Sequence, residues 1–138
     1  MKIPHFSIAA FLLVISPALS AKPICEAYDI EGVVLSGTVV LRTFFGPPNY
    51  GENPETDSKE VQALLKLDHP LCTVESVERE EQAERNQRQV TLVPMGGFSL
   101  KPYAGKHVSV KGSLFHADNG HHRTPVLIAI RQQPVLDR

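Results

Sequence analysis

The stretch from His107 to His116 has the sequence HVSVKGSLFH, in which apolar and polar side chains alternate. Alternation with a period of two residues is typical of a β-strand with one face buried and the other exposed. One face of this strand would carry Val108, Val110, Gly112, Leu114 and His116. We therefore expect residues 107–116 to form a strand whose valine and leucine face lies in the core.

Further strand-like segments, separated by glycine, proline and asparagine, make up most of the remaining sequence. A long strand is expected over 30–45, with a bend or bulge at Gly37. Residues 59–67 favour a strand, although their alanine and leucine content would also permit a helical turn. The other expected elements are strands at 71–77, 90–93 and 125–130, and a short turn or helix within 98–106.

These elements predict an all-β fold, and their order suggests a small five-stranded barrel. The arrangement resembles the OB-fold, with residues 103–112 in the place where such folds often enter their fourth strand. A β-sandwich with a similar number of strands is the alternative. One domain over residues 21–138 is expected, because 118 residues suffice for a single modest core.

Residues 75–88 are crowded with charge and nearly free of apolar side chains. Glu81 with Arg85, and Glu84 with Arg88, have the spacing of ion pairs across a helical turn. Without an apolar stripe the segment cannot belong to the core. We expect a solvated helical excursion or a long mobile hairpin, with an acidic binding site as the less favoured interpretation.

The N-terminus has the three parts of a cleavable export signal. Lys2 and His5 precede the apolar run 8–15, and small residues follow Pro17. The apolar run is too short to span a bilayer, which argues against the alternative of a retained membrane anchor. We expect a signal peptide over residues 1–20 and a periplasmic or secreted protein, not inserted in the membrane after cleavage.

After removal of residues 1–20, the formal charge would be near −2. This balance gives no electrostatic attraction to nucleic acid or to an anionic membrane. Basic residues interleaved with aromatic ones, as in proteins that bind single strands, are also missing. We therefore expect no nucleic-acid partner, even for a barrel of OB type.

Cys25 and Cys72 are the only cysteines in the chain. In an oxidising compartment, two cysteines most simply form one disulfide. The bridge would close a loop of 48 residues and stabilise the fold by about 4 kcal/mol through restriction of the unfolded chain. Two buried free thiols are the alternative.

Three stretches carry a more specific resemblance: residues 45–50 (FGPPNY), 65–68 (LKLD), and 112–127 with Gly112-x-Leu114-Phe115-His116 and Gly120-His121-His122-x-Thr124-Pro125-Val126-Leu127. Together they resemble an uncharacterised family of exported bacterial domains of unknown function. The resemblance implies a protein of the bacterial envelope and a small barrel. It transfers no catalytic residue.

The loop at residues 46–57 is one candidate binding site, because three prolines stiffen it. Pro48 and Asn49 lead to Tyr50, whose ring would offer a large contact surface that loses little entropy on binding. Alternatively, Tyr50 folds back as a lid on the barrel. We expect Pro48, Asn49 and Tyr50 to contact a ligand or partner.

The loop at residues 116–124 is the other candidate, because histidines cluster there. His116, His121 and His122 could bind zinc, with Asp118 as an oxygen ligand. Their spacing matches no strong metal motif, and no cofactor is otherwise expected. The simpler interpretation is that His116, His122 and Thr124 hydrogen-bond to loop backbone or contact a ligand.

The sequence contains no pattern that indicates catalysis. Ser99 lacks the second glycine of a nucleophile elbow, and no phosphate-binding Gly-Lys-Ser/Thr loop occurs. The many glutamates lie in the charged segment, where burial and tuned pKa values are not expected. We expect a non-enzymatic binding or interaction module of the envelope for a protein, peptide or envelope ligand, with a metal-binding periplasmic protein as the alternative.

Overall fold

The computed structural model describes residues 25–137, and the expected signal peptide lies outside them. The described chain forms strands and two single-turn 3-10 helices, with no α-helix. None of its helices is long and apolar enough to cross a membrane. In chain order the elements are β1 (Val33–Phe45), β2 (Lys59–Leu71), η1 (Val77–Arg79), β3 (Gln87–Pro94), η2 (Lys101–Tyr103), β4 (His107–His116), β5 (Val126–Ile130) and β6 (Val135–Leu136).

Five of the strands close into a ring in the order β1-β2-β3-β5-β4, because β4 also pairs with β1. The β3–β5 pair is parallel and the other pairs are antiparallel. The predicted all-β class and five-stranded ring are confirmed. The sandwich alternative is wrong, because the strands make one continuous sheet and not two packed ones.

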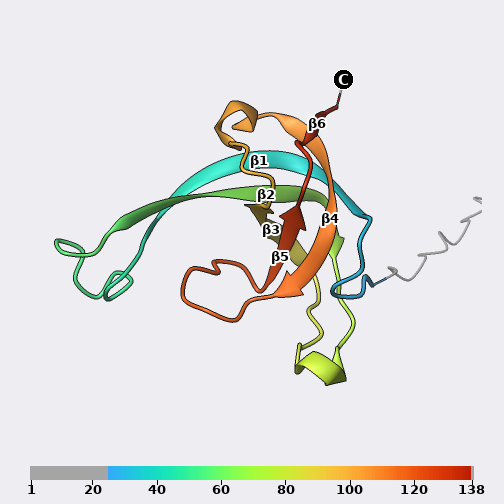
Figure 1. The fold of residues 1–138 in the computed structure, drawn as a ribbon, viewed down its shortest axis with the longest axis horizontal. Helices are drawn as coiled ribbons and strands as arrows, with labels where there is room; N and C mark the ends of the chain where they lie inside the picture. The colour runs from blue at the N-terminus through green and yellow to red at the C-terminus, as the bar shows by residue number, and fades with distance from the viewer. Residues whose placement is uncertain (1–24, 138) are drawn as a thin grey trace, which may run out of the picture.

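The ring is uneven. β1 and β2 pair from Gly37↔Leu67 out to Phe45↔Lys59, whereas β1 pairs with β4 only up to Thr38. The outer halves of β1 and β2 therefore leave the ring as a two-stranded arm, which Figure 1 shows extending to the left with the loop 46–58 at its tip. This arm carries one candidate loop away from the core.

The alternation in β4 works as predicted. Val108, Val110 and Leu114 are buried, while His107 and Lys111 are exposed. The buried strand residues form one cluster inside the ring: Val33, Val39, Ala63, Leu65, Leu71, Val90, Leu92, Val108, Val110, Leu114, Val126, Ile128 and Ile130. Burial of each valine, leucine or isoleucine side chain in this cluster stabilises the fold by roughly 1.5–3 kcal/mol.

Two glycines allow strands to approach closely. A Cβ at Gly37 would stand 2.1 Å from the carbonyl oxygen of Lys66, and one at Gly112 would stand 2.1 Å from that of Ala129. Each glycine lies where its strand passes from one partner to the next. The glycines thus permit the sharp curvature that closes the ring.

The expected strand at 71–77 is wrong. β2 instead continues through His69 and Pro70 to Leu71, and Cys72 follows its end. Proline is tolerated because the pairing of β2 with β3 shifts register between Lys66 and Leu71, so the missing N–H breaks no ladder hydrogen bond.

The charged segment 75–88 lies outside the core, as expected, but the helical pairing predicted for it is wrong. It contains the single turn η1 and an isolated bridge between Ser76 and Glu81, and β3 begins at Gln87. Glu84 points to His116, where the two side chains lie 3.0 Å apart. The segment is a hairpin-like excursion.

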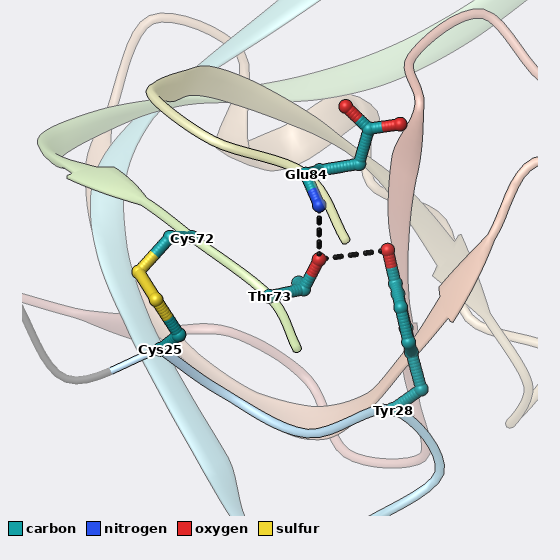
Figure 2. Close-up of a disulfide and its surroundings, with 5 residues drawn as sticks. All are labelled: Cys25, Tyr28, Cys72, Thr73 and Glu84. Atoms are coloured by element: carbon teal, nitrogen blue, oxygen red, sulfur yellow. Dashed lines mark hydrogen bonds between the residues drawn. A yellow bond between two sulfur atoms is a disulfide. The ribbon is translucent and has the colours of Figure 1, made fainter. Parts of the chain in front are cut away.

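The predicted disulfide between Cys25 and Cys72 is confirmed. Figure 2 shows it beside a hydrogen-bonded chain in which Thr73 Oγ1 donates to the Tyr28 hydroxyl (2.8 Å) and accepts from the Glu84 N–H (3.0 Å). The Tyr28 hydroxyl donates in turn to the Gln82 carbonyl. Burial raises the pKa of Tyr28. The bridge and this network hold the N-terminal segment and the excursion against the ring.

Candidate binding site

Asp57 organises the loop at the tip of the β1–β2 arm. Its carboxylate accepts hydrogen bonds from the backbone N–H groups of Asn49 (2.9 Å), Gly51 (2.7 Å) and Asn53 (3.2 Å). The side-chain amide of Asn49 adds a fourth donor. Tyr50 adopts the left-handed conformation, with φ of 52°. One buried carboxylate thus fixes the backbone on both sides of Tyr50.

The environment of Asp57 favours its charged form. Desolvation raises the pKa of this carboxyl, but the hydrogen bonds from Gly51, Asn49 and Asn53 together outweigh it. The pKa therefore lies below the ordinary value of 3.8. The loop keeps its organising anion at neutral pH.

Tyr50 joins the arm to the loop 117–125, which connects β4 to β5. Its hydroxyl lies 3.4 Å from His121 Nε2, and the two rings meet edge to face at 5.6 Å. Gly120 lies against the tyrosine ring, where an added Cβ would come within 3.1 Å of it. Tyr50 folds back onto this loop, yet it stays 41% exposed.

Glu60 links this contact to Arg123. Glu60 on β2 contacts His121 Nδ1 (2.8 Å) and, at 3.6 Å, the guanidinium of Arg123. Arg123 also donates to the Phe45 carbonyl and lies over the Phe44 and Tyr50 rings, 5.1 and 5.6 Å from their centroids. We call Tyr50, Glu60, His121 and Arg123 the loop clasp. It couples the two candidate loops.

A groove of roughly 440 Å³ opens beside the loop clasp, where β2 and β3 separate. Its volume is in the range of ligand pockets in proteins, and its lining is mainly apolar. Polar groups lie at its rim, including Lys101, His121 and His122. The remaining lining residues are Leu41, Val61, Gln62, Ala63, Thr91, Leu92, Val93, Pro94, Phe98, Ser99 and Leu100.

The sequence-predicted loop residues occupy different positions relative to this groove. His122 lines it, and Tyr50 contacts its neighbour His121. Asn49 uses its amide and its N–H to bind Asp57. Pro48 is exposed next to it, and the Pro47–Pro48 peptide bond is cis.

Thr124 and His116 make internal contacts. Thr124 is buried; its hydroxyl accepts from the Thr91 N–H and lies 2.7 Å from the Val126 carbonyl. Both ring nitrogens of His116 are near acceptors, with Nδ1 3.0 Å from the Ala117 carbonyl and Nε2 3.0 Å from Glu84. These two residues hold the ends of the loop 117–125 in place.

The three histidines considered as zinc ligands do not converge. His121 contacts Glu60, His116 contacts Glu84, and His122 Nδ1 accepts from the Asp118 N–H at 3.1 Å. Within residues 25–137, no three histidine, cysteine, aspartate or glutamate side chains are placed to hold a metal ion. The strand and loop geometry separates residues that are close in the sequence.

Sequence reasoning missed Glu60, Gln62 and Arg123. Strand alternation puts Glu60 and Gln62 on the face of β2 opposite Ala63, which could have marked them as surface residues. That they meet the loop 117–125 depends on the β1–β2 arm passing over it, as the Gln62 hydrogen bond to the His121 carbonyl shows (2.7 Å). No local pattern encodes this contact.

A second titratable cluster lies away from the groove. His107 on β4 is held between Asp68 of β2 and Asp137 near the C-terminus, with a ring nitrogen 2.9 Å from each carboxylate. The hydrogen bond to Asp68 raises the pKa of His107, and the negative charges of both aspartates raise it further, against a smaller opposing effect of desolvation. This cluster ties the end of the chain to the ring.

Residues 87–132 match a family described as a domain of unknown function (DUF4431). The matched range runs from the start of β3 past the end of β5, and so includes η2, β4 and the loop 117–125. Neither a curated protein nor a solved structure matches the chain significantly. The similarity therefore covers the side of the groove formed by β3 and the loops, without the β1–β2 arm.

Proposed function

We propose that the protein is an exported, non-enzymatic binding module of the bacterial envelope, and that its ligand or partner occupies the groove between β2 and β3. The main support for this proposal is the groove itself, which has an apolar lining and a few polar groups at its rim. The loop clasp holds the two flanking loops beside it. The strand order resembles the OB-fold, whose ligands commonly bind over the β2–β3 face.

An extracytoplasmic location agrees with the disulfide, because such bridges persist in oxidising compartments. It also agrees with the export signal expected over residues 1–20. The groove lining presents no nucleophile paired with a general base. A binding role therefore accounts for these features more simply than a catalytic one.

The first test is capture from envelope extract with two matched variants. Val61 and Val34 are strand valines with 58% and 60% exposure, but only Val61 lines the groove. We expect Val61→Glu to lose the captured partner, because it replaces an apolar side chain of the groove lining with a larger, charged one. Val34→Glu should capture it at the wild-type level, as judged by mass spectrometry of eluted proteins.

Equal capture by both variants would contradict a site in the groove. Loss of capture with both would contradict it as well, provided that the two variants melt at the same temperature as the wild type. The partner's identity then comes from the wild-type eluate.

A further inference from the structure

The groove lies along an open strand edge. β2 and β3 pair at Leu64↔Thr91 and Leu65↔Val90, but no pair joins Lys59–Ala63 to β3. The groove is lined both by Val61 and Ala63, from the inner face of β2, and by Gln62, from its outer face. A cavity that touches both faces of a strand must run along its edge.

The backbone of Val61 faces this edge. The Val39 N–H donates to the Lys106 carbonyl and the Val39 carbonyl accepts from Gly105, so the backbone groups of Val39 point away from β2. Backbone direction alternates along an antiparallel ladder, so Thr43 also points away from β2 and its partner Val61 points away from β1. The N–H and C=O of Val61 are therefore directed at the groove, where no strand is registered opposite them.

The opposite wall of the groove, β3, offers fewer backbone hydrogen-bond donors. The Met95 N–H donates to the Ile130 carbonyl of β5, so by alternation the backbone nitrogen of Pro94 faces β2. Proline has no N–H to donate, and it commonly protects a strand edge. At this point the β3 wall therefore offers no backbone donor, whereas Val61 on β2 offers an N–H.

The charges at the groove favour peptide segments with acidic side chains. Its lining contains Lys101, His121 and His122 and no carboxylate. Glu60, the nearby acid, is already engaged by His121 and Arg123. Apolar side chains can pack among Leu41, Ala63 and Phe98 while an acidic side chain meets Lys101 at the rim.

We propose that the groove binds an extended, acidic peptide segment as an added strand along the Val61 edge of β2. This inference rests on the proposed function and specifies its partner. Main-chain hydrogen bonds to Val61 would provide affinity, and alternating apolar and acidic side chains would provide specificity. A compact small molecule or an oligonucleotide would make no use of the strand edge.

The test is an NMR titration of the full mature protein with acetyl-Val-Glu-Val-Glu-Val-amide. We expect amide shifts confined to the groove and weaker binding of acetyl-Val-Lys-Val-Lys-Val-amide. Val61→Pro should weaken binding of the acidic peptide about tenfold, because it removes one main-chain hydrogen bond. Thr43→Pro, on the opposite edge of the same arm, should stay within about twofold.

Methylation of the central valine nitrogen in the peptide removes a donor to the Val61 carbonyl with the protein unaltered, and should also weaken binding. Equal affinity for the methylated peptide, or no groove shifts at millimolar peptide, would overturn strand addition. If the peptide fails but Val61→Glu still abolishes envelope capture, the proposed function stands and only the peptide inference falls. If capture is also unaffected by Val61→Glu, both fall.

Discussion

At the scale of single residues, one carboxylate sets the shape of the arm tip. Replacing Asp57 with Ala removes the acceptor shared by Asn49, Gly51 and Asn53. We expect faster hydrogen exchange at these three amides, with the core amides unchanged, and intermediate rates for Asp57→Asn, which keeps one acceptor oxygen. Unchanged exchange in Asp57→Ala would show that the prolines alone order the loop.

The depressed pKa of Asp57 gives this order a defined pH dependence. The charged form contributes its stabilisation above the ordinary pKa of 3.8, and the contribution is lost as pH falls through the lower folded value. The loop amides of the wild type should therefore stay protected at pH 4 and lose protection only in stronger acid. Loss of protection well above pH 4 would contradict the assigned hydrogen bonds.

The pKa of His107 is raised, so its effect on stability has the opposite pH dependence. Its folded pKa lies above 6.5, so its contacts with Asp68 and Asp137 stabilise the fold below pH 6.5 and lose that contribution as pH rises through the folded pKa. We expect His107→Gln to lower the free energy of unfolding most at acidic pH, with the difference shrinking at alkaline pH. Urea titrations of both proteins across this range measure it, and a constant difference would contradict the ion pairs.

At the scale of elements, close approach at the glycines controls closure of the ring. Gly37→Ala would bring a Cβ against the Lys66 carbonyl and should destabilise the fold by about 1–3 kcal/mol. Val34→Ala, on the exposed face of the same strand, should change stability by less than about 0.5 kcal/mol. Similar stability of the two variants in urea would show that the strands relax at Gly37.

Local sequence patterns predicted the elements in which the alternation of apolar and polar residues matches the observed burial. β4 belongs to this group. The extension of β2 through Pro70 was missed because it depends on a register shift against β3, and two-residue β6 was missed because it forms only by pairing with β4. A pairing partner distant in the sequence leaves no trace in a short window.

The residues of the candidate site also divide into those that the sequence marked and those that it did not. Tyr50 and His121 each stood out in their own loop, but the contact between them, and the part played by Glu60 and Arg123, arise from the arm lying over the loop 117–125. The groove was not foreseen at all, because it exists where two strands fail to pair. An absence of pairing cannot be deduced from either strand alone.

At the scale of the whole molecule, the bridge between Cys25 and Cys72 stabilises the ring by linking the segment before β1 to the end of β2. We expect reduction, or the double variant Cys25→Ser and Cys72→Ser, to lower the free energy of unfolding by about 4 kcal/mol. Guanidinium titrations with and without reductant measure this. A loss below about 1 kcal/mol would show that the Tyr28 and Thr73 network alone holds the segment in place.

We propose that the protein meets its partner in the envelope at the gap between β2 and β3. Site-specific photocross-linking in living cells tests it most directly, with a photoreactive residue at Val61 in one strain and at the equally exposed Val34 in another. We expect a discrete adduct from position 61 and none from position 34. Adducts from position 34 alone, or from neither position, would contradict it.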